Sequence, residues 1–272
     1  MNAPPAEVLD LFAVPGDVTP LPGGSGRSHR AGDLVLSPGR DERIQAWLSP
    51  VLAHLAVRLD ENPERRARDL RVAMPVPARD GSWVVDGWAA CRYEPDAVTC
   101  RDLDVTLAAG RLLHAQLAAA VRTRPPGLDE REDQWTRAER LAFGPAHAML
   151  SAAAGTTAAG AVRRVEHYLA DIPLGEDQLV HADLAGNVLL DRRGAPVIID
   201  VSPYWRPVRW AEAIAAVDMV AWFRAPVSVL EPWAAGRERQ ALLRALVFRA
   251  FADQPFKPSA YTSLLAVAAP RL

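Results

Sequence analysis

Four polar residues next to short apolar runs make residues 180–200 the part of the sequence best suited to chemistry. These residues are His181, Asp183, Asn187 and Asp200. The apolar runs 188–190 and 197–199 have the length of short strands, so the pattern predicts a loop followed by two strands. Carboxylate and amide oxygens held on a stiff frame are the ligands that a hard cation prefers. The segment therefore predicts a site for magnesium and phosphate.

The order and spacing of these residues resemble a known catalytic segment. The chain reads Val-His-Ala-Asp-Leu-Ala-Gly-Asn from residue 180, and Asp200 follows thirteen residues after Asn187. Protein-kinase-like phosphotransferases, most closely the aminoglycoside phosphotransferase and choline kinase branch, carry His-Gly-Asp-Leu-x-x-x-Asn and then an apolar strand that ends in Asp. The loop from Asp183 to Asn187 is one residue shorter than this common form. This shorter loop and the sequence of residues 202–207, Ser-Pro-Tyr-Trp-Arg-Pro, are similar to an actinobacterial subgroup of the family.

The resemblance implies a role for each of the four residues. Asp183 would orient the attacking hydroxyl and accept its proton, and His181 would be a framework residue that fixes the loop. Asn187 and Asp200 would hold the magnesium ions that bridge the phosphates of ATP. Without the resemblance, the same segment would be interpreted as a hairpin in an ordinary α/β domain, with residues 191–194 as its turn.

The family layout also predicts the fold class, which is α+β and two-lobed, of the protein-kinase-like type. A small, β-rich lobe formed by residues 1–90 would bind the nucleotide. A larger and mostly helical lobe formed by residues 91–272 would carry the catalytic segment and the acceptor site. The chain is long enough for two modest lobes of this kind.

Apolar periodicity and turn residues predict the elements that must position the catalytic segment. Pro50 would bend or interrupt one of the helices. The predicted elements are a lead-in helix at 7–12, strands on either side of a glycine run and at 34–36, a hairpin of strands 72–77 and 82–93, and helices at 41–59, 102–122, 132–143, 156–169, 207–223 and 231–251.

A glycine-rich run between two predicted strands is a candidate for phosphate binding. It consists of Gly23, Gly24, Ser25 and Gly26. Glycine lets the backbone approach an anion and present its N–H groups, although a plain flexible turn is the alternative interpretation. The family layout places this loop over the nucleotide phosphates, with Arg30 nearby. The same layout places the main chain of Ala90 and Arg92 at the adenine edge.

The lysine that the family carries on its third strand is missing. The position where it would be expected is Ser37, and the only lysine in the chain is Lys257. The following helix also lacks the usual glutamate partner, apart from Glu42 at its start. The cation and its counter-charge have therefore been lost together.

Three explanations of this loss are open. Magnesium and the glycine-loop amides could suffice for a slow enzyme, or the protein could be a pseudokinase that keeps the fold for regulation. An arginine could instead supply the charge, because a guanidinium binds phosphate well, although with a different geometry from an ammonium group. The candidates for this arginine are Arg27, Arg30 and Arg40.

Bulk composition excludes several classes of function. A net charge of −2 gives no electrostatic case for nucleic-acid binding. Cys91 and Cys100 show no CxxC or metal-ligand spacing, so neither a disulfide framework nor a zinc site is indicated. There is no secretory signal pattern and no run of about twenty apolar residues. We therefore expect a cytoplasmic protein that does not contact a membrane.

The charge of the acceptor can be predicted only coarsely. Residues 207–272, where the family builds its acceptor site, contain eight basic and five acidic residues, which does not favour a cationic acceptor. An anionic or flat, partly apolar alcohol would fit better, although core packing is an equally good interpretation of Trp210. The residues that would suit such an acceptor are Tyr204, Trp205, Arg206, Arg209 and Trp210.

The sequence as a whole predicts an enzyme that uses ATP and Mg²⁺. It would transfer the γ-phosphoryl group to a hydroxyl of a small molecule or natural-product intermediate. The alternative is a pseudokinase that acts as a nucleotide-sensing or scaffold module. A hydrolase that uses His181 and Asp183 is disfavoured, because the chain has no Gly-x-Ser-x-Gly motif or other activated nucleophile. The sequence makes no prediction of oligomeric state.

Overall fold

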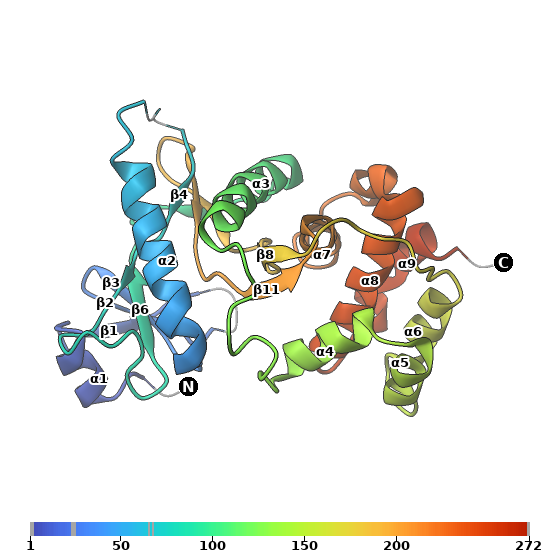
Figure 1. Cartoon of the computed structure of the whole chain (residues 1–272), viewed down its shortest axis with the longest axis horizontal. Helices are drawn as coiled ribbons and strands as arrows, with labels where there is room; N and C mark the ends of the chain where they lie inside the picture. The colour runs from blue at the N-terminus through green and yellow to red at the C-terminus, as the bar shows by residue number, and fades with distance from the viewer. Residues whose placement is uncertain (1–2, 23–25, 65, 67, 271–272) are drawn as a thin grey trace. The chain divides into compact units, whose positions relative to one another are not determined.

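The computed structural model describes residues 3–22, 26–64, 66 and 68–270, and the chain divides into two compact units. Unit 1 contains residues 1–100, 125–128 and 186–200, and unit 2 contains residues 101–124, 129–185 and 201–272. Unit 1 thus extends beyond the predicted lobe boundary at residue 90 and includes part of the catalytic segment. The N-terminal region is rich in strands and the C-terminal region is helical (Figure 1), which confirms the predicted α+β class.

The strands of unit 1 form two sheets within the described residues. The larger sheet is antiparallel and has the strand order β1-β2-β3-β6-β5, and the smaller has the order β4-β10-β9-β7. The strands of the larger sheet are β1 (Val18–Pro20), β2 (His29–Ala31), β3 (Leu34–Ser37), β5 (Pro75–Val76) and β6 (Ala89–Arg92). Those of the smaller sheet are β4 (Arg71–Val72), β7 (Val98–Thr99), β9 (Val188–Leu190) and β10 (Pro196–Ile198).

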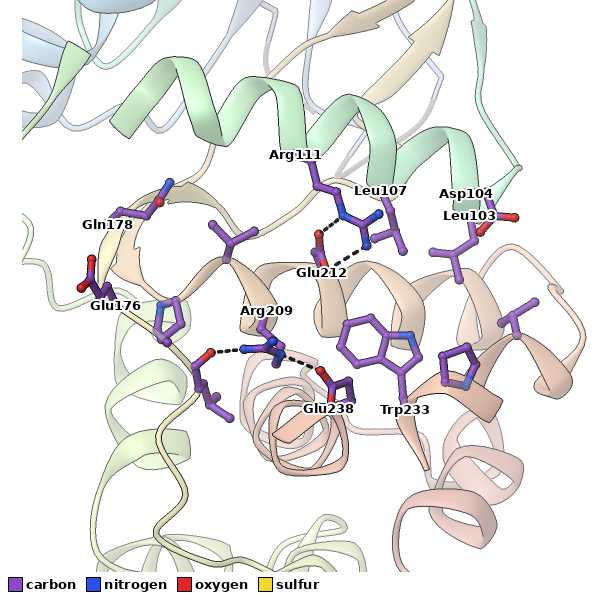
Figure 2. A pocket seen from close by; sticks show the side chains of 16 residues that line it. Leu103, Asp104, Leu107, Arg111, Glu176, Gln178, Arg209, Glu212, Trp233 and Glu238 are labelled. Atoms are coloured by element: carbon purple, nitrogen blue, oxygen red, sulfur yellow. Dashed lines mark hydrogen bonds and ion pairs between the residues drawn. The ribbon is translucent and has the colours of Figure 1, made fainter. Parts of the chain in front are cut away.

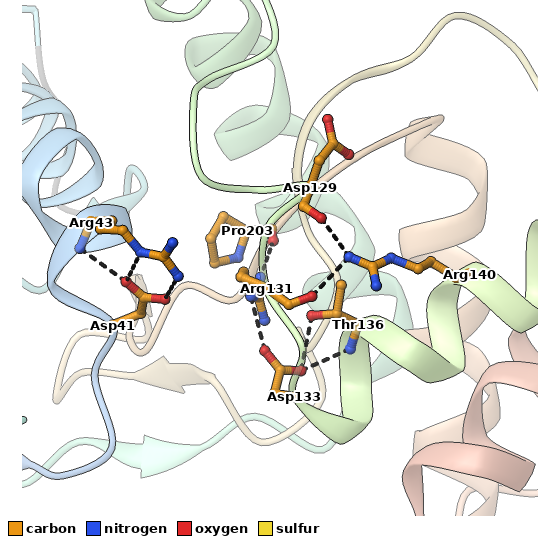
Figure 3. A network of polar contacts seen from close by, with 8 residues as sticks. All are labelled: Asp41, Arg43, Asp129, Arg131, Asp133, Thr136, Arg140 and Pro203. Carbon is orange, nitrogen blue, oxygen red and sulfur yellow. Dashed lines mark hydrogen bonds and ion pairs between the residues drawn. The ribbon is translucent and has the colours of Figure 1, made fainter.

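Two helices belong to the described part of unit 1. The first, α1 (Ala6–Leu11), packs through Val8 into the apolar cluster beneath the larger sheet. The second, α2 (Glu42–Asp60), begins at Asp41, whose carboxylate accepts a hydrogen bond from the N–H of Arg43 at 2.9 Å (Figure 3). It continues through Pro50 without interruption, because buried apolar residues lie on the same face of the helix on both sides of the proline.

Unit 2 is mostly helical around a small antiparallel sheet of β8 (Gln178–His181) and β11 (Pro203–Arg206). In this sheet His181 pairs with Pro203. The helices are α3 (Leu103–Ala120), α4 (Gln134–Phe143), α5 (Ala146–Ala153), α6 (Ala159–Glu166), α7 (Val208–Ala221), α8 (Gly236–Ala252) and α9 (Thr262–Ala268), with the 3₁₀ helices η1 (Val227–Trp233) and η2 (Pro258–Tyr261).

The core of unit 2 contains an aromatic group centred on Trp210 of α7, which is fully buried. Its ring makes edge-to-face contacts with Phe143, Tyr204 and Phe248, with centroid distances of 5.3, 5.5 and 5.3 Å. Trp210 is therefore a packing residue, the second of the two interpretations offered by the sequence.

The segment before α4 is tied to β11 by a network of polar contacts (Figure 3). Arg131 donates to the carbonyl of Pro203 at 3.0 Å and forms an ion pair with Asp133 at 3.0 Å. Asp133 in turn caps α4 by accepting a hydrogen bond from the N–H of Thr136 at 2.8 Å. Because Pro203 pairs with His181, this network supports the strand that leads into the catalytic loop.

Several predicted boundaries were wrong. Residues 146–153, which lie between two predicted helices, form α5, and α9 was not predicted. Both are short and rich in alanine, so they lack a clear apolar period. The helix expected from residue 231 begins instead at Gly236, after η1, where Gly236 has φ +63°. In the expected hairpin only β5 and β6 pair, because residues 71–72 join the other sheet.

Candidate active site

Asp183 follows the end of a deeply buried strand. Leu179, Val180 and His181 of β8 have no exposed surface, whereas the side chain of Asp183 is 41% exposed. Leu184, the next residue, is again fully buried. The carboxylate is therefore presented to solvent from a backbone that is anchored on both sides, as a catalytic group requires.

One oxygen of this carboxylate is bound by an arginine from α8. Nη2 of Arg249 lies 2.8 Å from Oδ1 of Asp183. The same guanidinium donates through Nε to Oδ1 of Asp218 at 2.7 Å and through Nη2 to Oδ2 of Asp218. Burial raises the pKa of Asp218 to about 7, although the charge of Arg249 opposes this rise. Neither Arg249 nor Asp218 was predicted as a site residue from the sequence. The sequence feature that could have identified them is a charged residue on the buried face of an otherwise apolar helix.

His181 lies at a structural junction. Its backbone N–H donates to Nε2 of His114 in α3 at 3.1 Å, and its ring nitrogen Nδ1 accepts from the N–H of Ser202 at 3.1 Å. Burial, with the nearby His181, lowers the pKa of His114 to about 3, so His114 is neutral and can accept this bond. These contacts connect α3, β8 and the start of β11, which agrees with a framework role for His181.

In unit 1, Asn187 and Asp200 lie at the same end of a hairpin. Asn187 immediately precedes β9, Asp200 follows β10, and the register pairs Val188 with Ile198. The carbonyl of Asn187 accepts a hydrogen bond from the N–H of Ile199 at 2.9 Å, which closes this end. The predicted loop and two strands are thus present, and both predicted metal ligands emerge together from unit 1.

Asp200 has an unusual backbone and a charged partner. Its φ is +48°, a region that residues with a Cβ seldom adopt and that is often found at functional sites. Its Oδ1 lies 2.6 Å from Nη1 of Arg40, a residue that follows β3 in the same unit. Burial alone would lower the pKa of Arg40, but the carboxylate of Asp200 raises it above its ordinary value. Arg40, one of the three candidate arginines, therefore contacts a residue of the motif.

Three solved structures resemble the whole chain. Choline kinase LicA from Streptococcus pneumoniae matches with a TM-score of 0.53 at 12% identity, over 97% of each chain. A thermostable mutant of aminoglycoside phosphotransferase APH(4)-Ia in its apo form matches with a TM-score of 0.57 at 15% identity, over 96% of each chain. A ternary complex of this enzyme with ADP and hygromycin B matches with a TM-score of 0.55 at 16% identity, over 96% of each chain.

The chain has the fold of aminoglycoside phosphotransferases and choline kinases. Neither a protein-family model nor a curated protein sequence matches it. Because identities of 12–16% show the fold alone, the function must be argued from the residues of the site.

Gly26 and the position expected for the lysine lie within the described residues of this fold. Gly23, Gly24 and Ser25 lie outside the described residues, and Gly26 has φ +65°, which glycine adopts without strain. At the position expected for lysine, the hydroxyl of Ser37 bonds the hydroxyl of Ser28 at 2.9 Å. This contact links β3 to the segment that follows the glycine loop.

The remaining predicted nucleotide contacts lie on the larger sheet. Arg30 donates to the carbonyl of Gly32 at 2.9 Å and stacks over the ring of Tyr93 at 4.1 Å. Ala90 and Arg92 lie on β6, between β3 and β5. The N–H groups of Arg92 and Tyr93 are bonded to the carbonyls of Met74 and Asp33 at 2.9 and 2.8 Å. A contact of this strand with adenine remains a prediction and would have to use other backbone groups.

Unit 2 also contains a pocket of about 790 Å³ between α3, the start of α7, η1 and the start of α8 (Figure 2). Two ion pairs line it, Arg111 with Glu212 at 2.6 Å and Arg209 with Glu238 at 2.9 Å. Gln178, at the start of β8, also lines it, so the pocket lies at the opposite end of this strand from Asp183. Arg209, predicted to face the acceptor, thus has an acidic partner in a separate pocket.

Proposed function

We propose that the protein is a magnesium-dependent phosphotransferase that moves the γ-phosphoryl group of ATP to a hydroxyl of a small molecule or natural-product intermediate. The observation that carries this proposal is Asp183, a partly exposed carboxylate just after a buried strand, held by Arg249 in a kinase-like fold. A carboxylate in this setting is suited to orient a hydroxyl and receive its proton. Because the reaction depends on ATP, we place the protein in the cytoplasm.

In the proposed reaction, Asp183 accepts the proton of the acceptor hydroxyl. The hydroxyl oxygen forms a bond to the γ-phosphorus, while the bond from this phosphorus to the bridging oxygen breaks and ADP leaves with the electron pair. His181 keeps the backbone of the loop in place through its bonds to His114 and Ser202. Most of the rate acceleration would come from positioning and from neutralisation of charge.

The residues at the end of the hairpin fit a magnesium ion. Magnesium is often bound by one or two protein oxygens together with substrate phosphates and water. Asn187 and Asp200 offer an amide and a carboxylate oxygen from the same end of β9 and β10. The described residues contain no cluster of three or more His, Cys, Asp or Glu that could hold a metal without a substrate. When bound, magnesium would neutralise phosphate charge.

We assign to Arg40 the positive charge that the strand lysine supplies in this family. Arg40 follows β3 by three residues, and its guanidinium contacts Asp200 rather than a helix glutamate. A guanidinium can bind a second oxyanion through its remaining N–H donors, so Arg40 could contact Asp200 and a phosphate together. Lysine and arginine side chains differ in geometry. An arginine that takes over the role of the lysine is therefore expected at a different position in the chain.

Calorimetric titration of ATP into the protein, with and without Mg²⁺, tests this function. We expect binding that is stronger with Mg²⁺ in the wild type and independent of Mg²⁺ in Asp200→Asn. Asp191→Asn is the matched control, because Asp191 caps the turn of the same hairpin through the N–H of Arg193 at 2.8 Å. If the wild type bound ATP with the same affinity with and without Mg²⁺, the role of Asp200 as a magnesium ligand would be contradicted.

The pseudokinase alternative is favoured by one observation, the ion pair of Arg40 with Asp200. A protein that only senses nucleotides could keep Asp200 in this pair permanently. It would bind ATP without releasing ADP under any condition. Measurement of ADP release from MgATP therefore separates the two functions.

The charge of the acceptor is a separate proposal. We propose an acceptor that is not clearly cationic, on the basis of the basic excess in residues 207–272. Two of the basic residues expected near the acceptor already have acidic partners within unit 2, since Arg209 pairs with Glu238, and Arg206 pairs with Glu139. A screen should therefore include neutral, anionic and amine-bearing alcohols, and faster phosphorylation of the amines would contradict this proposal.

A further inference from the structure

Arg249 is unusual among the arginines of unit 2 because its guanidinium joins two carboxylates that have different exposure. Asp218 is 4% exposed and Asp183 is 41% exposed, while Arg249 itself is 10% exposed. Nε and Nη2 both face Asp218, and Nη2 also reaches Oδ1 of Asp183 at 2.8 Å. The arginine therefore extends from the interior to the one of the two carboxylates that solvent can reach readily.

Asp218 fixes the guanidinium before any substrate binds. A free arginine would lose much rotamer entropy on holding Asp183 in one orientation. Here the forked contact with Asp218 already fixes the plane of the guanidinium, and the ring of Phe248 lies 5.2 Å from its carbon. Arg249 can thus act as a preorganised contact for Asp183.

The ion pair of Arg249 and Asp183 has other charged and titratable neighbours in unit 2. The titratable and charged groups around this pair are Asp218 from α7, Asp253 after α8 with its hydrogen-bonded Tyr261 from η2, Tyr204 from β11, and Arg131 and Asp133 before α4.

We propose that Arg249, held by Asp218, is a positioning residue that orients the carboxylate of Asp183 for proton acceptance. This role rests on the proposed phosphotransferase function. In the transfer step, the proton of the acceptor hydroxyl moves to Asp183 while Arg249 stays protonated and holds Oδ1. Arg249 itself exchanges no proton and does not touch the phosphoryl group.

The test uses Arg249→Met and Arg249→Lys in the full-length chain, with Arg244→Met as the matched control. Arg244 lies on the same helix and is partly buried, but donates to the carbonyl of Ala142 at 2.8 Å. We expect Arg249→Met to lower kcat about 100-fold, with the Kd for MgATP changed less than about twofold, because only the base is disturbed. The kcat–pH profile is measured for the wild type and for each variant.

Arg249→Lys keeps a cation beside Asp218 and guards against misfolding. A lysine cannot bridge two carboxylates with a rigid fork, so we expect a smaller fall in kcat, about tenfold, and a native melting curve. Arg244→Met should keep the wild-type kcat and pH profile. In the Asp183→Asn background, Arg249→Met should have no further effect on kcat, because its target has been removed.

The outcomes distinguish this role from the proposed function. An active wild type whose Arg249 variants keep its kcat and pH profile would overturn the role of Arg249 alone. An equal loss of kcat with and without Asp183 would also overturn it, since Arg249 would then not act through that residue. A wild type that binds ATP but never releases ADP would overturn the phosphotransferase function, and the catalytic role of Arg249 with it.

Discussion

Asp183 and Asp200, the two carboxylates of the catalytic segment, are each bound by an arginine that is far away in the sequence. Arg249 binds Asp183 within unit 2, and Arg40 binds Asp200 within unit 1. The side chain of Asp183 is about half exposed, so water partly screens the energy of its ion pair with Arg249. The main effect of both contacts is therefore to fix orientation, and the predictions at this scale concern activity and ligand affinity.

Asp183→Asn removes the base and keeps the shape of the side chain. We expect kcat to fall about 10²- to 10⁴-fold, the usual contribution of a positioned base, with little change in ATP affinity. Steady-state ADP release and calorimetry measure the two quantities. Asp191→Asn, the same change in the hairpin turn, is the control and should keep the wild-type kcat. Normal turnover by Asp183→Asn would exclude Asp183 as the base.

Arg40→Met removes the charge assigned to phosphate binding. We expect the Kd for MgATP to rise about tenfold, because a charge-assisted hydrogen bond to phosphate would be lost. Arg43→Met is the matched control, since Arg43 lies three residues later and pairs with exposed Asp41 at 3.1 Å. An unchanged Kd in Arg40→Met would mean that magnesium and the glycine loop bind the phosphates without this arginine.

The motif residues could be predicted from the sequence because they lie within twenty residues of one another and have characteristic types. Their arginine partners could not, because any of thirty arginines could have reached them. The absence of the strand lysine suggested Arg27, Arg30 and Arg40 as candidates, and the contact of Arg40 with Asp200 is the basis for proposing Arg40. Nothing comparable in the sequence pointed to Arg249.

At the scale of elements, α3 holds the catalytic loop through close packing. A Cβ atom on Gly110 of α3 would lie 2.5 Å from Cδ1 of Leu184, the residue after Asp183. Leu184 is fully buried, so it has little room to move. The absence of a side chain at Gly110 therefore lets α3 approach the loop.

Gly110→Ala should lower both the stability and the activity of the protein. We expect the free energy of unfolding to fall by about 1–2 kcal/mol from overpacking, and kcat to fall because Leu184 would displace Asp183. Gly160→Ala in α6 is the control, because nothing lies within 4 Å of its added Cβ, and it should be neutral or stabilising by up to about 1 kcal/mol. Urea unfolding tests both variants, and a Gly110→Ala protein as stable and active as the wild type would contradict the packing argument.

His114 connects α3 to β8 and makes stability depend on pH. Its pKa is about 3 in the folded protein, against a usual value of 6.5, because burial disfavours the charged ring. Below pH 6.5 the unfolded chain binds a proton that the folded chain does not, so this residue costs stability as the pH falls from about 6.5 towards 3.

His114→Gln should therefore be less harmful at low pH. The destabilisation that it causes should be about 2 kcal/mol smaller at pH 5 than at pH 7, given 1.36 kcal/mol for each pH unit below the usual pKa. Urea unfolding at both values measures this difference. His54→Gln, the same change at an exposed residue of α2, is measured beside it as the control. A pH-independent effect of His114→Gln would show that the folded protein also binds this proton.

Element prediction succeeded where apolar periods were long or caps were clear. The helices that became α2 and α3 have buried faces with three- and four-residue spacing and begin at the capping residues Asp41 and Asp102. Short helices without such signals, α5 and α9, were missed. The pairing of strands could not be predicted either, because β4 pairs with β10 across more than a hundred residues.

At the scale of the whole molecule, the fold limits the function without specifying it. Structural neighbours with TM-scores above 0.5 include a choline kinase and an aminoglycoside phosphotransferase, whose names indicate different acceptors. No described helix is long and apolar enough to cross a membrane. The choice between an enzyme and a pseudokinase therefore depends on whether the residues around Asp183 and Asp200 transfer a phosphoryl group.

The most direct test of this account is incubation of the wild type with MgATP and a library of hydroxyl-bearing small molecules. Mass spectrometry of the products should detect a compound that has gained one phosphoryl group, with matching ADP release. Asp183→Asn should lose this product, and Asp191→Asn should retain it. Wild-type protein that binds MgATP but yields neither a phosphorylated compound nor ADP would contradict the account and identify a nucleotide-binding pseudokinase.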